Sequence, residues 1–594
     1  MKIRYLDGSR LYYAVLAGGE AVIRDQAYLN RINVFPVPDA DTGTNLASTM
    51  RAIAERARAS RSARATLHSI ADAALHGARG NSGLIFAQFL YGLSQEVREE
   101  RRLTARHFAE SVRRAVEHAR RAILTPVEGT MLTVLHDWAE ALYEERLKKA
   151  DFVELLTHSL QAAERSLKET PRKLAVLARA GVVDAGAKGF FDFLEGVAGF
   201  IKKGSLRRAR GTGPTDLPAP PVIHAGRSRL TKRFCSEALL VGEAIDVEAV
   251  QDLVRKAGDS AVIAGSPRKL KLHVHTDDAA SLFFELQKLG TIQDIKADDM
   301  RRQYEAAHER KARIAILTDS SCDLPPQVLD AHQIHVIPFN LFFGDSLFLD
   351  KVTIEPDRFY DLLKSRPEMP KSAQPSQAVV RRALEFLAGQ YDGIIAVSIS
   401  SGLTGFYDQL VKAREDLGLE SSQVAVVDSR HLSVTEALVV LRVAEAVREG
   451  GAVKGIARAA AEWVRRTSLW VDIRTLKYMV RGGRVSPAKG LLAAVLNIKP
   501  IVGLDAAGKA TVLGKSFSRR ANMKKILGLI REAAAGRPVW NYGIVHAQNP
   551  GRAGRYAEAL EAALGKAPAF ITDVSPVVGV HNGLGAVGVG LMFE

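Results

Sequence analysis

A Pro-, Gly- and Arg-rich stretch at residues 204–229 divides this chain into two parts with different hydrophobic patterns. Before it, apolar residues recur at the i, i+3, i+4 spacing of helices, as in Leu67, Ile70 and Ala74. After it, strand-like segments are separated by helical segments. Some of the strand-like segments alternate apolar and polar residues, and others are short apolar runs. We expect an all-α bundle before this stretch and α/β domains after it.

The length of 594 residues suggests three or four domains. We expect a helical bundle at 1–203, a linker at 204–229, a small α/β domain at 230–310 and a two-lobed α/β domain with a parallel sheet at 311–594. The parallel sheet is indicated by two apolar runs, each of which ends in a polar turn, at 314–321 and 393–400. Ligands of such sheets bind at the carboxyl ends of the strands.

The composition favours a cytoplasmic protein. The formal net charge is +16, but Lys and Arg are spread along helices instead of alternating with aromatic residues, so we expect no nucleic acid partner. Cys235 and Cys322 are too few for a disulfide framework, and no run of about 18 apolar residues appears. The positive charge could still attract ATP, or hold the protein peripherally at an anionic membrane.

Acidic, small and helix-starting residues are concentrated at residues 33–45, NVFPVPDADTGTN. Asp39 and Asp41 are one residue apart, so both carboxylates can turn toward one hard cation, and Asn33 can add a third oxygen. The next four residues begin a helix and offer backbone N–H groups and polar side chains to an anion. They are Thr42, Gly43, Thr44 and Asn45. Two interpretations remain, a magnesium and nucleotide phosphate site, or a surface Asx turn with a helix cap.

The whole string closely resembles the signature of the nucleotide-binding domain of dihydroxyacetone kinases (the DhaL type), in the version found in bacterial fatty acid kinases. The resemblance covers about the first 200 residues, because three small, polar breaks follow in the family's order, GARGNSG, TPVEGTM and VDAGAKG. It implies an ATP site in which Asp39 and Asp41 hold Mg²⁺ on the phosphates. The nucleotide-binding residues expected from the three breaks are Asn81, Ser82, Gly129, Thr130, Asp184 and Gly186.

Three possible metal ligands lie in the segment after the linker. The sequence KLKLHVH at 269–275 alternates as a strand and places His273 and His275 on one side, while Cys235 begins another apparent strand. The three side chains could supply a Cys/His/His zinc site, or they could be ordinary half-exposed residues of two strands. The segments FCSE and HVHTDD resemble the middle domain of fatty acid kinases, in which these positions are linked to zinc, and this implies Zn²⁺ here.

Hydroxyl, glycine and basic residues gather in four segments of the last part of the chain, SAQPS, SSGLTG, RGGR and HNGLGAVG. Serine hydroxyls and N–H groups beside glycine can donate to one carboxylate oxygen and His581 to the other, while Arg484 can neutralise a carboxylate or its phosphate. Ser401 and His581 could also form a nucleophile pair. We set this aside, because no G-x-S-x-G elbow surrounds Ser401 and no acid partner is identifiable.

These segments, opened by ILTDSS and closed by VVGVHNGLGAVG, resemble the DegV family of fatty-acid-binding proteins across residues 313–594. In that family a long acyl chain is buried between two lobes, and hydroxyls and a histidine hold its carboxyl group. The positions implicate Ser372, Ser401 and His581, with the neighbouring Ser400, and place Arg484 near the phosphate.

Together the resemblances predict a fused fatty acid kinase, a phosphotransferase that uses ATP and a bound long-chain fatty acid to make acyl phosphate and ADP. Asp39, Asp41 and Arg484 are the expected catalytic residues. A carboxylate is already nucleophilic at neutral pH, so we expect positioning and charge neutralisation to dominate and assign no catalytic base. We also expect a homodimer, and an acyl phosphate-using acyltransferase at the membrane as a partner.

Two other functions remain open. A kinase of dihydroxyacetone or a related small hydroxyketone would fit the name of the first family, although no segment resembles the substrate domain of those enzymes. A lipid carrier or sensor, whose first domain only binds nucleotide, would bind fatty acid without forming acyl phosphate.

Overall fold

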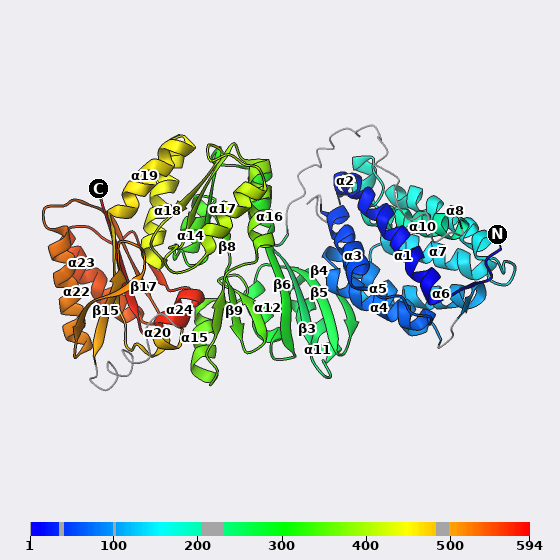
Figure 1. The fold of residues 1–594 in the computed structure, drawn as a ribbon, viewed down its shortest axis with the longest axis horizontal. Coiled ribbons are helices and arrows are strands. Elements are labelled where there is room, and N and C mark those ends of the chain that lie inside the picture. The colour runs from blue at the N-terminus through cyan, green and yellow to red at the C-terminus, as the bar shows by residue number, and fades with distance from the viewer. Residues whose placement is uncertain (1, 35–40, 99–101, 204–230, 483–497) are drawn as a thin grey trace. The chain divides into compact units, whose positions relative to one another are not determined.

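The computed structural model describes residues 2–34, 41–98, 102–203, 231–482 and 498–594. Asp39, Arg484 and the linker expected at 204–229 therefore lie outside the described residues. The chain divides into two compact units, Met1–Asp278 with Glu285–Asp298, and Ala279–Phe284 with Asp299–Glu594 (Figure 1).

The first unit begins with a helical bundle, as the sequence predicts (Figure 1). A short antiparallel pair, β1 (Tyr5–Leu6) with β2 (Leu103–Thr104), joins two of its loops. The helices are α1 (Gly8–Arg24), α2 (Gln26–Arg31), α3 (Thr42–Arg56), α4 (Ala63–Gly77), α5 (Gly80–Glu96), α6 (Ala105–Ala122), α7 (Met131–Glu145), α8 (Phe152–Lys173), α9 (Ala175–Ala180) and α10 (Ala185–Lys203).

Helix α5 lies at the centre of the bundle because it is apolar on nearly every side. Its Phe89 packs edge-to-face on Trp138 of α7 and Phe190 of α10, with ring centroids 6.2 Å apart in both pairs. Such aromatic pairs contribute about 0.5–1.5 kcal/mol beyond the burial of their area. The start of α5 is thereby fixed at one end of the bundle, close to the starts of α3, α7 and α10.

A four-stranded sheet completes the first unit, in the order β4-β5-β3-β6. Its elements are β3 (Phe234–Val241), α11 (Val247–Ala257), β4 (Gly258–Ser266), β5 (Lys269–Thr276) and β6 (Thr291–Asp299). The strand predicted at 269–275 is confirmed as β5. The sheet packs on the bundle through β4, whose Val262 and Ala264 join the core of the bundle and whose Gly265 N–H donates to Gln88 Oε1 at 2.7 Å.

The second unit contains the parallel sheet that the apolar runs predict. Its order is β13-β12-β7-β8, every neighbouring pair is parallel, and all residues of β12 are buried, as expected for a sheet covered on both faces. The strands are β7 (Ile314–Asp319), β8 (His335–Ile337), β12 (Gly393–Ser398) and β13 (Val424–Asp428). The helices of this part are α13 (Met300–His308), α14 (Pro326–Ala331), α16 (Gln377–Gln390), α17 (Phe406–Asp416), α18 (Ser433–Arg448) and α19 (Val453–Arg465), and α12 (Ala279–Leu286) precedes β6 in the chain.

The other lobe of the second unit is built on a mostly antiparallel sheet. Its six-stranded sheet, in the order β16-β15-β14-β19-β17-β18, is antiparallel except for the pair β17 and β18. β15 and β16 are joined by a short hairpin, a connection that parallel strands cannot use. The elements are β14 (Thr467–Asp472), α20 (Lys477–Arg481), β15 (Lys499–Leu504), β16 (Ala510–Ser516), α22 (Arg519–Ala534), β17 (Val539–His546), α23 (Pro550–Leu564), β18 (Phe570–Asp573), α24 (Pro576–Asn582) and β19 (Val587–Phe593).

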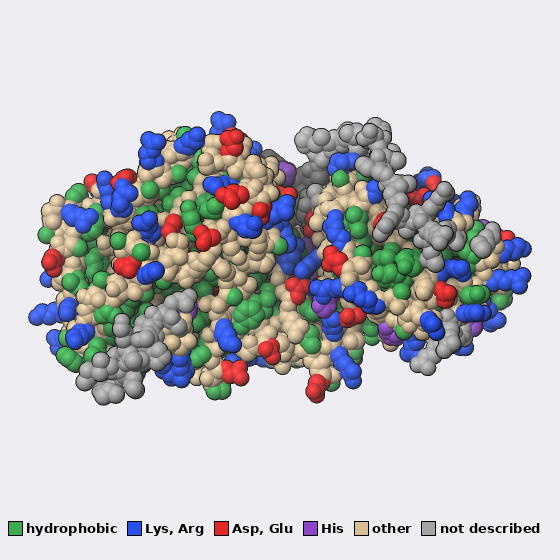
Figure 2. Space-filling view, in the orientation of Figure 1, with side chains coloured by type: hydrophobic (Ala, Val, Ile, Leu, Met, Phe, Trp, Pro, Cys, Tyr) green, Lys and Arg blue, Asp and Glu red, His purple; other side chains and the backbone are tan. Residues whose placement is uncertain are grey.

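A small antiparallel sheet, in the order β10-β9-β11, also belongs to the second unit. It consists of β9 (Asn340–Phe343), β10 (Ser346–Leu349) and β11 (Lys371–Ala373), with α15 (Pro356–Ser365) between the last two in the chain. Within the described ranges, no helix has both the length and the apolar character that crossing a membrane requires. Lys and Arg side chains are scattered over the visible face of both units (Figure 2).

Candidate functional site

Four helices of the bundle begin near one another, and the predicted nucleotide-binding residues lie at these starts. A Cβ atom on Gly80, whose φ of +58° suits glycine, would lie 2.4 Å from Asn45 Nδ2, so α5 starts directly beside α3. A Cβ atom on Gly186 would lie 2.8 Å from Ser82 Oγ and 3.3 Å from Met131 Cε, so α10 starts beside α5 and α7. Helix N-termini attract anions through free N–H groups and the helix dipole, and a group of them suits a polyphosphate.

The start of α3 keeps a carboxylate available. Asp41 occupies the N-cap position, is half-buried, and makes no capping hydrogen bond with its side chain. The loop is held instead by α2, where Asn30 Oδ1 accepts from the N–H of Thr44 at 3.0 Å. The interpretation of the string as a simple capped Asx turn is therefore weakened, and Asp41 can serve a cation.

Other predicted nucleotide-binding residues are already engaged within the protein. The buried Asp184 carboxylate accepts from the N–H groups of Ala187 and Met131, and so joins the starts of α10 and α7. Burial raises the pKa of Asp184 to about 6, although these two hydrogen bonds oppose the rise. The hydroxyl of Thr130 donates to Val127 O at 2.8 Å, and Gly129 N–H donates to Thr133 Oγ1 at 2.9 Å.

Asn81 carries an unsatisfied polar atom at these helix starts. Its Oδ1 is buried and has no hydrogen-bond partner in the described part of the protein. A buried polar atom of this kind is costly unless a ligand or water satisfies it. The residues of this end of the bundle therefore fit a ligand with hydrogen-bond donors as well as phosphates, such as a nucleotide.

The three predicted metal ligands come together on one face of the middle sheet. Cys235 pairs with His275 across β3 and β5, and one ligand atom from each of Cys235, His273 and His275 lies within 4.8 Å of the others. The two Nε2 atoms are 3.3 Å apart. Two nitrogens bound tetrahedrally at about 2.0–2.1 Å from zinc would lie roughly 3.3 Å apart, so the spacing fits a zinc ion.

Burial favours the neutral forms of these ligands. It lowers the pKa of His275 to about 3, with a further contribution from the neighbouring His273, so the imidazole stays neutral as a metal ligand requires. Burial also raises the pKa of the Cys235 thiol well above its usual range. A thiol at this position would lose its proton when it binds a metal.

Two charged residues that the sequence interpretation missed complete this face. Burial opposes ionisation of Glu237, but the hydrogen bond with His273 and the charges of Lys296 and Arg79 outweigh it and hold the pKa of Glu237 well below its usual range. Lys296 pairs with Asp298 at 2.8 Å. Its pKa is raised by Asp298, Glu237, Cys235 and Asp41 against the effect of burial.

Asp41 belongs to the same unit and is near enough for its charge to contribute to the raised pKa values of Cys235 and Lys296. The period-two pattern around Cys235 could have indicated Glu237, because residues i and i+2 of a strand share a face. Lys296 carried no comparable signal, because β6 contains no recognisable motif.

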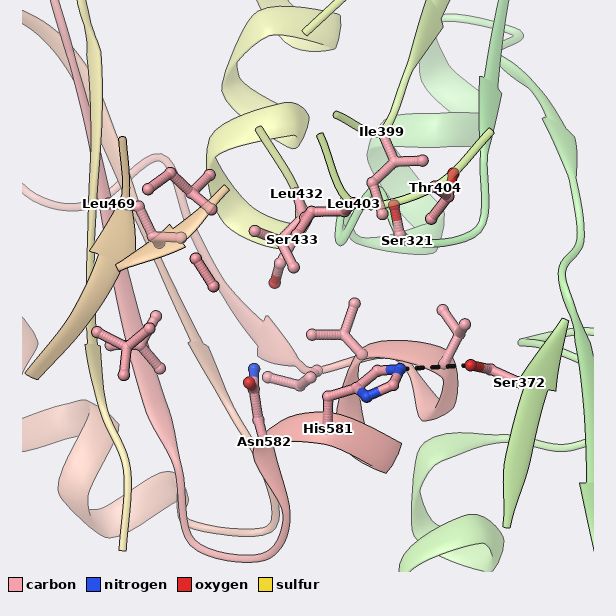
Figure 3. A pocket seen from close by; sticks show the side chains of 18 of the residues that line it. Ser321, Ser372, Ile399, Leu403, Thr404, Leu432, Ser433, Leu469, His581 and Asn582 are labelled. Carbon is pink, nitrogen blue, oxygen red and sulfur yellow. Dashed lines mark hydrogen bonds between the residues drawn. The ribbon is translucent and has the colours of Figure 1, made fainter. Parts of the chain in front are cut away.

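The second unit encloses a cavity of about 430 Å³ between its two large sheets (Figure 3). Aliphatic side chains form most of its wall, among them Ile399, Leu403, Leu432, Leu469, Val471 and Met479. Polar atoms are few, and the side chains that supply them include Ser321, Ser372, Thr404, Ser433, His581 and Asn582. An apolar cavity with a few polar groups suits a ligand that has a hydrocarbon body and one polar end.

Ser372 and His581, both predicted from the sequence, meet at this cavity. Ser372 Oγ of β11 lies 3.3 Å from His581 Nε2 of α24 (Figure 3). The helix that carries His581 is held at its start by buried carboxylates, since Asp350 Oδ1 accepts from Val577 N–H at 3.1 Å and Asp323 Oδ1 from Ser575 N–H at 3.0 Å.

Gly482, the second residue of the RGGR segment, lies against the same imidazole. A Cβ atom on Gly482 would lie 2.3 Å from His581 Nδ1, so the backbone after α20 lies directly against the ring. Arg484, two residues further on, is outside the described residues.

Ser400 and Ser401 do not line the cavity. The Ser400 hydroxyl donates to Gly508 O at 2.9 Å, and the Ser401 hydroxyl donates to Asp428 Oδ2 at 2.6 Å. Both follow the end of β12 as predicted, but their hydroxyls turn toward the turn between β15 and β16 and toward the end of β13.

Ser321 and Ser433, which the sequence interpretation did not select, line the cavity instead. Ser321 Oγ lies 2.6 Å from Asp319 Oδ1 and 2.7 Å from Glu436 Oε2, and Ser433 donates to Asp323. Burial and the charge of Asp319 raise the pKa of Glu436 well above its usual range. The ILTDSS string already contained Ser321, whereas no motif marked Ser433.

Comparison with known proteins places three family models along the chain. The model described as DAK2 domain matches residues 36–199, the model of the FakA-like middle domain of fatty acid kinase matches 231–307, and the model described as uncharacterised protein, DegV family, matches 313–594. These matches confirm the three predicted resemblances.

Curated relatives share only part of this arrangement. An uncharacterized protein of Staphylococcus epidermidis is 31% identical over 317 residues, which is 51% of this chain and 56% of that protein. Protein YloV of Bacillus subtilis is 29% identical over 327 residues, 53% of this chain and 59% of its own. The chain thus spans little more than half the length of these relatives.

Similar solved structures cover about half of the chain. The crystal structure of DegV, a fatty acid binding protein from Bacillus subtilis, is 26% identical with a TM-score of 0.43, and covers 48% of this chain and 100% of that one. A DegV family protein from Thermus thermophilus, described by its fatty acid binding, is 23% identical with a TM-score of 0.45 and the same coverage. The models of a DAK2 domain, a FakA-like middle domain and a DegV-family protein thus match consecutive parts of one polypeptide.

Proposed function

We propose that this protein is a fused fatty acid kinase. The first unit would bind ATP with Mg²⁺, the second would bind a long-chain fatty acid, and the products would be acyl phosphate and ADP. The observation that carries this proposal is the apolar cavity with Ser372 and His581 at its wall, in a chain whose first unit matches a DAK2 domain.

The first unit offers what a nucleotide needs. The starts of α3, α5, α7 and α10 lie together, Asn81 Oδ1 lacks a partner among described residues, and Asp41 makes no capping bond. Asp41 would hold Mg²⁺ together with Asp39 and Asn33, and the ion would neutralise charge on the transferred phosphoryl group. Thr44 and Asn45 of α3 and Ser82 of α5 would contact the phosphates.

The second unit offers what a fatty acid needs. The aliphatic wall would bury the hydrocarbon chain, at roughly 0.8 kcal/mol for each CH₂ group removed from water. The Ser372 hydroxyl and His581 Nε2–H would each donate to the carboxylate, which would separate them slightly from their present contact. Arg484 would neutralise the acyl phosphate. A carboxylate attacks phosphorus without prior deprotonation, so the chain's task is to orient and desolvate it.

We further propose that Cys235, His273 and His275 bind Zn²⁺. The ligand spacing fits the ion, and three protein ligands leave a fourth position open. The homodimer and the membrane acyltransferase that would consume the acyl phosphate remain predictions.

Lipid extraction followed by a trapping assay tests the proposal. Mass spectrometry of lipid extracted from the purified protein should find a fatty acid. Incubation with ATP, Mg²⁺ and hydroxylamine should then release an acyl hydroxamate, because hydroxylamine captures acyl phosphate. Bound fatty acid without hydroxamate would favour the lipid carrier or sensor. Phosphorylation of dihydroxyacetone, with no fatty acid bound, would favour the small hydroxyketone kinase.

A further inference from the structure

One carboxylate touches both the metal cluster and the nucleotide end of the first unit. Glu237 is fully buried on β3, two residues after Cys235 and on the same face of the sheet. Its Oε1 lies 2.6 Å from Gly80 N and 3.3 Å from His273 Nδ1, and its Oε2 lies 3.1 Å from Arg79 Nη1. The residues on the bundle side and the residues on the metal side are therefore joined by a single side chain.

The contact with His273 has the geometry of a support for a metal ligand. His273 faces His275 with Nε2, at 3.3 Å, and faces Glu237 with Nδ1, which also lies 3.9 Å from Cys235 Sγ. When Nε2 of a histidine binds a metal, the other nitrogen usually donates to a carboxylate, which fixes the ring orientation and raises the basicity of the ligand. Metal bound by His273 would therefore require a proton on Nδ1, and that proton would strengthen the bond to Glu237.

The contact with the bundle concerns the start of α5. Gly80 is the first residue of that helix, and its N–H donates to Glu237 at the position where a ligand phosphate could otherwise bind. Arg79 precedes the helix and is held by the second oxygen. Asn81 and Ser82, which we propose as nucleotide-binding residues, follow directly, so their placement depends on how Glu237 holds Gly80.

We propose that Glu237 is a positioning residue that couples metal binding at Cys235, His273 and His275 to nucleotide binding at the start of α5. Metal bound to His273 orients Nδ1–H toward Glu237, and Glu237 then fixes Arg79 and Gly80, so that Asn81 and Ser82 are ordered before nucleotide arrives. Pre-ordering removes part of the entropy cost of binding and raises affinity. The coupling is reciprocal, since nucleotide must raise metal affinity by the same factor. This inference rests on the proposed nucleotide site.

The test compares affinities in the full chain, with and without zinc. The dissociation constant of ATP in the presence of Mg²⁺ is measured by calorimetry on protein loaded with Zn²⁺ and on protein stripped by a chelator. We expect zinc to tighten ATP binding at least about fivefold, the lower end of typical coupling between sites. Zinc affinity, measured by chelator competition with and without ATP, should change by the same factor.

Glu237→Gln keeps the size of the side chain, and its amide oxygen can still accept at the Oε1 position, but the substitution removes the negative charge that supports His273 and places an NH₂ group where Oε2 pairs with Arg79. The zinc effect on ATP affinity should fall to about one. Arg79→Gln removes the ion pairs of Arg79 with Glu237 and Asp294, leaves the metal ligands in place, and should lower the effect as well. Asp294→Asn is the matched control, because Asp294 also pairs with Arg79, and with Lys271 at 2.6 Å, but no contact joins it to His273 or Gly80 among the described residues. This variant should keep the full effect.

An undiminished zinc effect in Glu237→Gln, or no zinc effect in the unmodified protein, would overturn the inference while leaving the kinase proposal in place. Failure of ATP to bind in any form would remove the nucleotide site, and the inference with it. Equal losses in Asp294→Asn and Glu237→Gln would overturn it too, because Glu237 would then act only as part of an ion-pair network.

Discussion

Replacing His581 by alanine is expected to weaken fatty acid binding by roughly 10- to 150-fold and to leave ATP binding unchanged. His581 Nε2 lies at the cavity, 3.3 Å from Ser372 Oγ. A hydrogen bond to a charged group is typically worth about 1.5–3 kcal/mol, and each 1.4 kcal/mol is tenfold in affinity. Ser372→Ala should cause a loss in the same range, because its hydroxyl would serve the same carboxylate.

Displacement of a fluorescent fatty acid by unlabelled ligand measures the effect. The matched ligand is the methyl ester of the same fatty acid, which keeps the hydrocarbon chain but carries no negative charge. The His581→Ala loss should be much smaller for the ester. The matched variant is Ser401→Ala, whose hydroxyl is exposed and bonded to Asp428 outside the cavity wall, and it should bind normally.

Two results would refute the reasoning. Unchanged fatty acid affinity in both His581→Ala and Ser372→Ala would mean that the carboxylate lies elsewhere in the cavity. Equal losses for the acid and its methyl ester would mean that the substitution collapses the cavity instead of removing a hydrogen bond to charge.

Three more outcomes follow from the site geometry. Asp41→Ala, or Asp39→Ala, should abolish acyl phosphate formation while fatty acid affinity persists, and near-normal turnover at saturating Mg²⁺ would contradict the assignment. Elemental analysis should find about one zinc per chain, lost together with thermal stability in Cys235→Ser, whereas metal-free protein of normal stability would leave these residues as ordinary strand residues. Burial raises the pKa of Asp350 to about 7. Between about pH 4 and 7 the carboxyl group keeps its proton in the folded chain and loses it in the unfolded chain. The free energy of unfolding therefore falls as the pH rises through this interval. The melting temperature of Asp350→Asn relative to the unmodified protein should therefore increase across that interval, and a constant difference would show that the carboxyl group does not titrate there.

Local patterns were enough to predict much of this molecule. The helical spacing of the first 200 residues, the alternation of KLKLHVH and the apolar run that leads into the polar end of ILTDSS each reflect contacts that recur within a few residues. Alternation within one strand placed His273 and His275 on one face, but Cys235 lies on another strand, and the resemblance to the middle domain of fatty acid kinases was needed to favour a metal site. Ser372 and His581 came from motifs that a family resemblance joins across the chain.

Long-range packing decided the rest. Glu237 meets Gly80 across 157 positions of sequence, and no local pattern carries that information. Ser433 reaches the cavity through a backbone with φ of +56°, which is unusual for serine and unmarked in the sequence. Ser400 and Ser401 had the right position after a buried strand, but their hydroxyls bond to Gly508 and Asp428, which the sequence did not place beside them.

The starts of the four helices also bear on which form of a nucleotide the proposed site would accept. Glu237 already serves the start of α5, and Asp184 serves those of α7 and α10, whereas the start of α3 is held by the neutral amide of Asn30, next to Asp41. At most helix starts the N–H groups are free to bind an anion, but here several of them already donate to carboxylates. The negative charge of these carboxylates would repel a polyphosphate that carries no cation. The site would then select for the bound cation as well as for the base. A divalent cation on the phosphates would offset their negative charge and reduce the repulsion by these carboxylates.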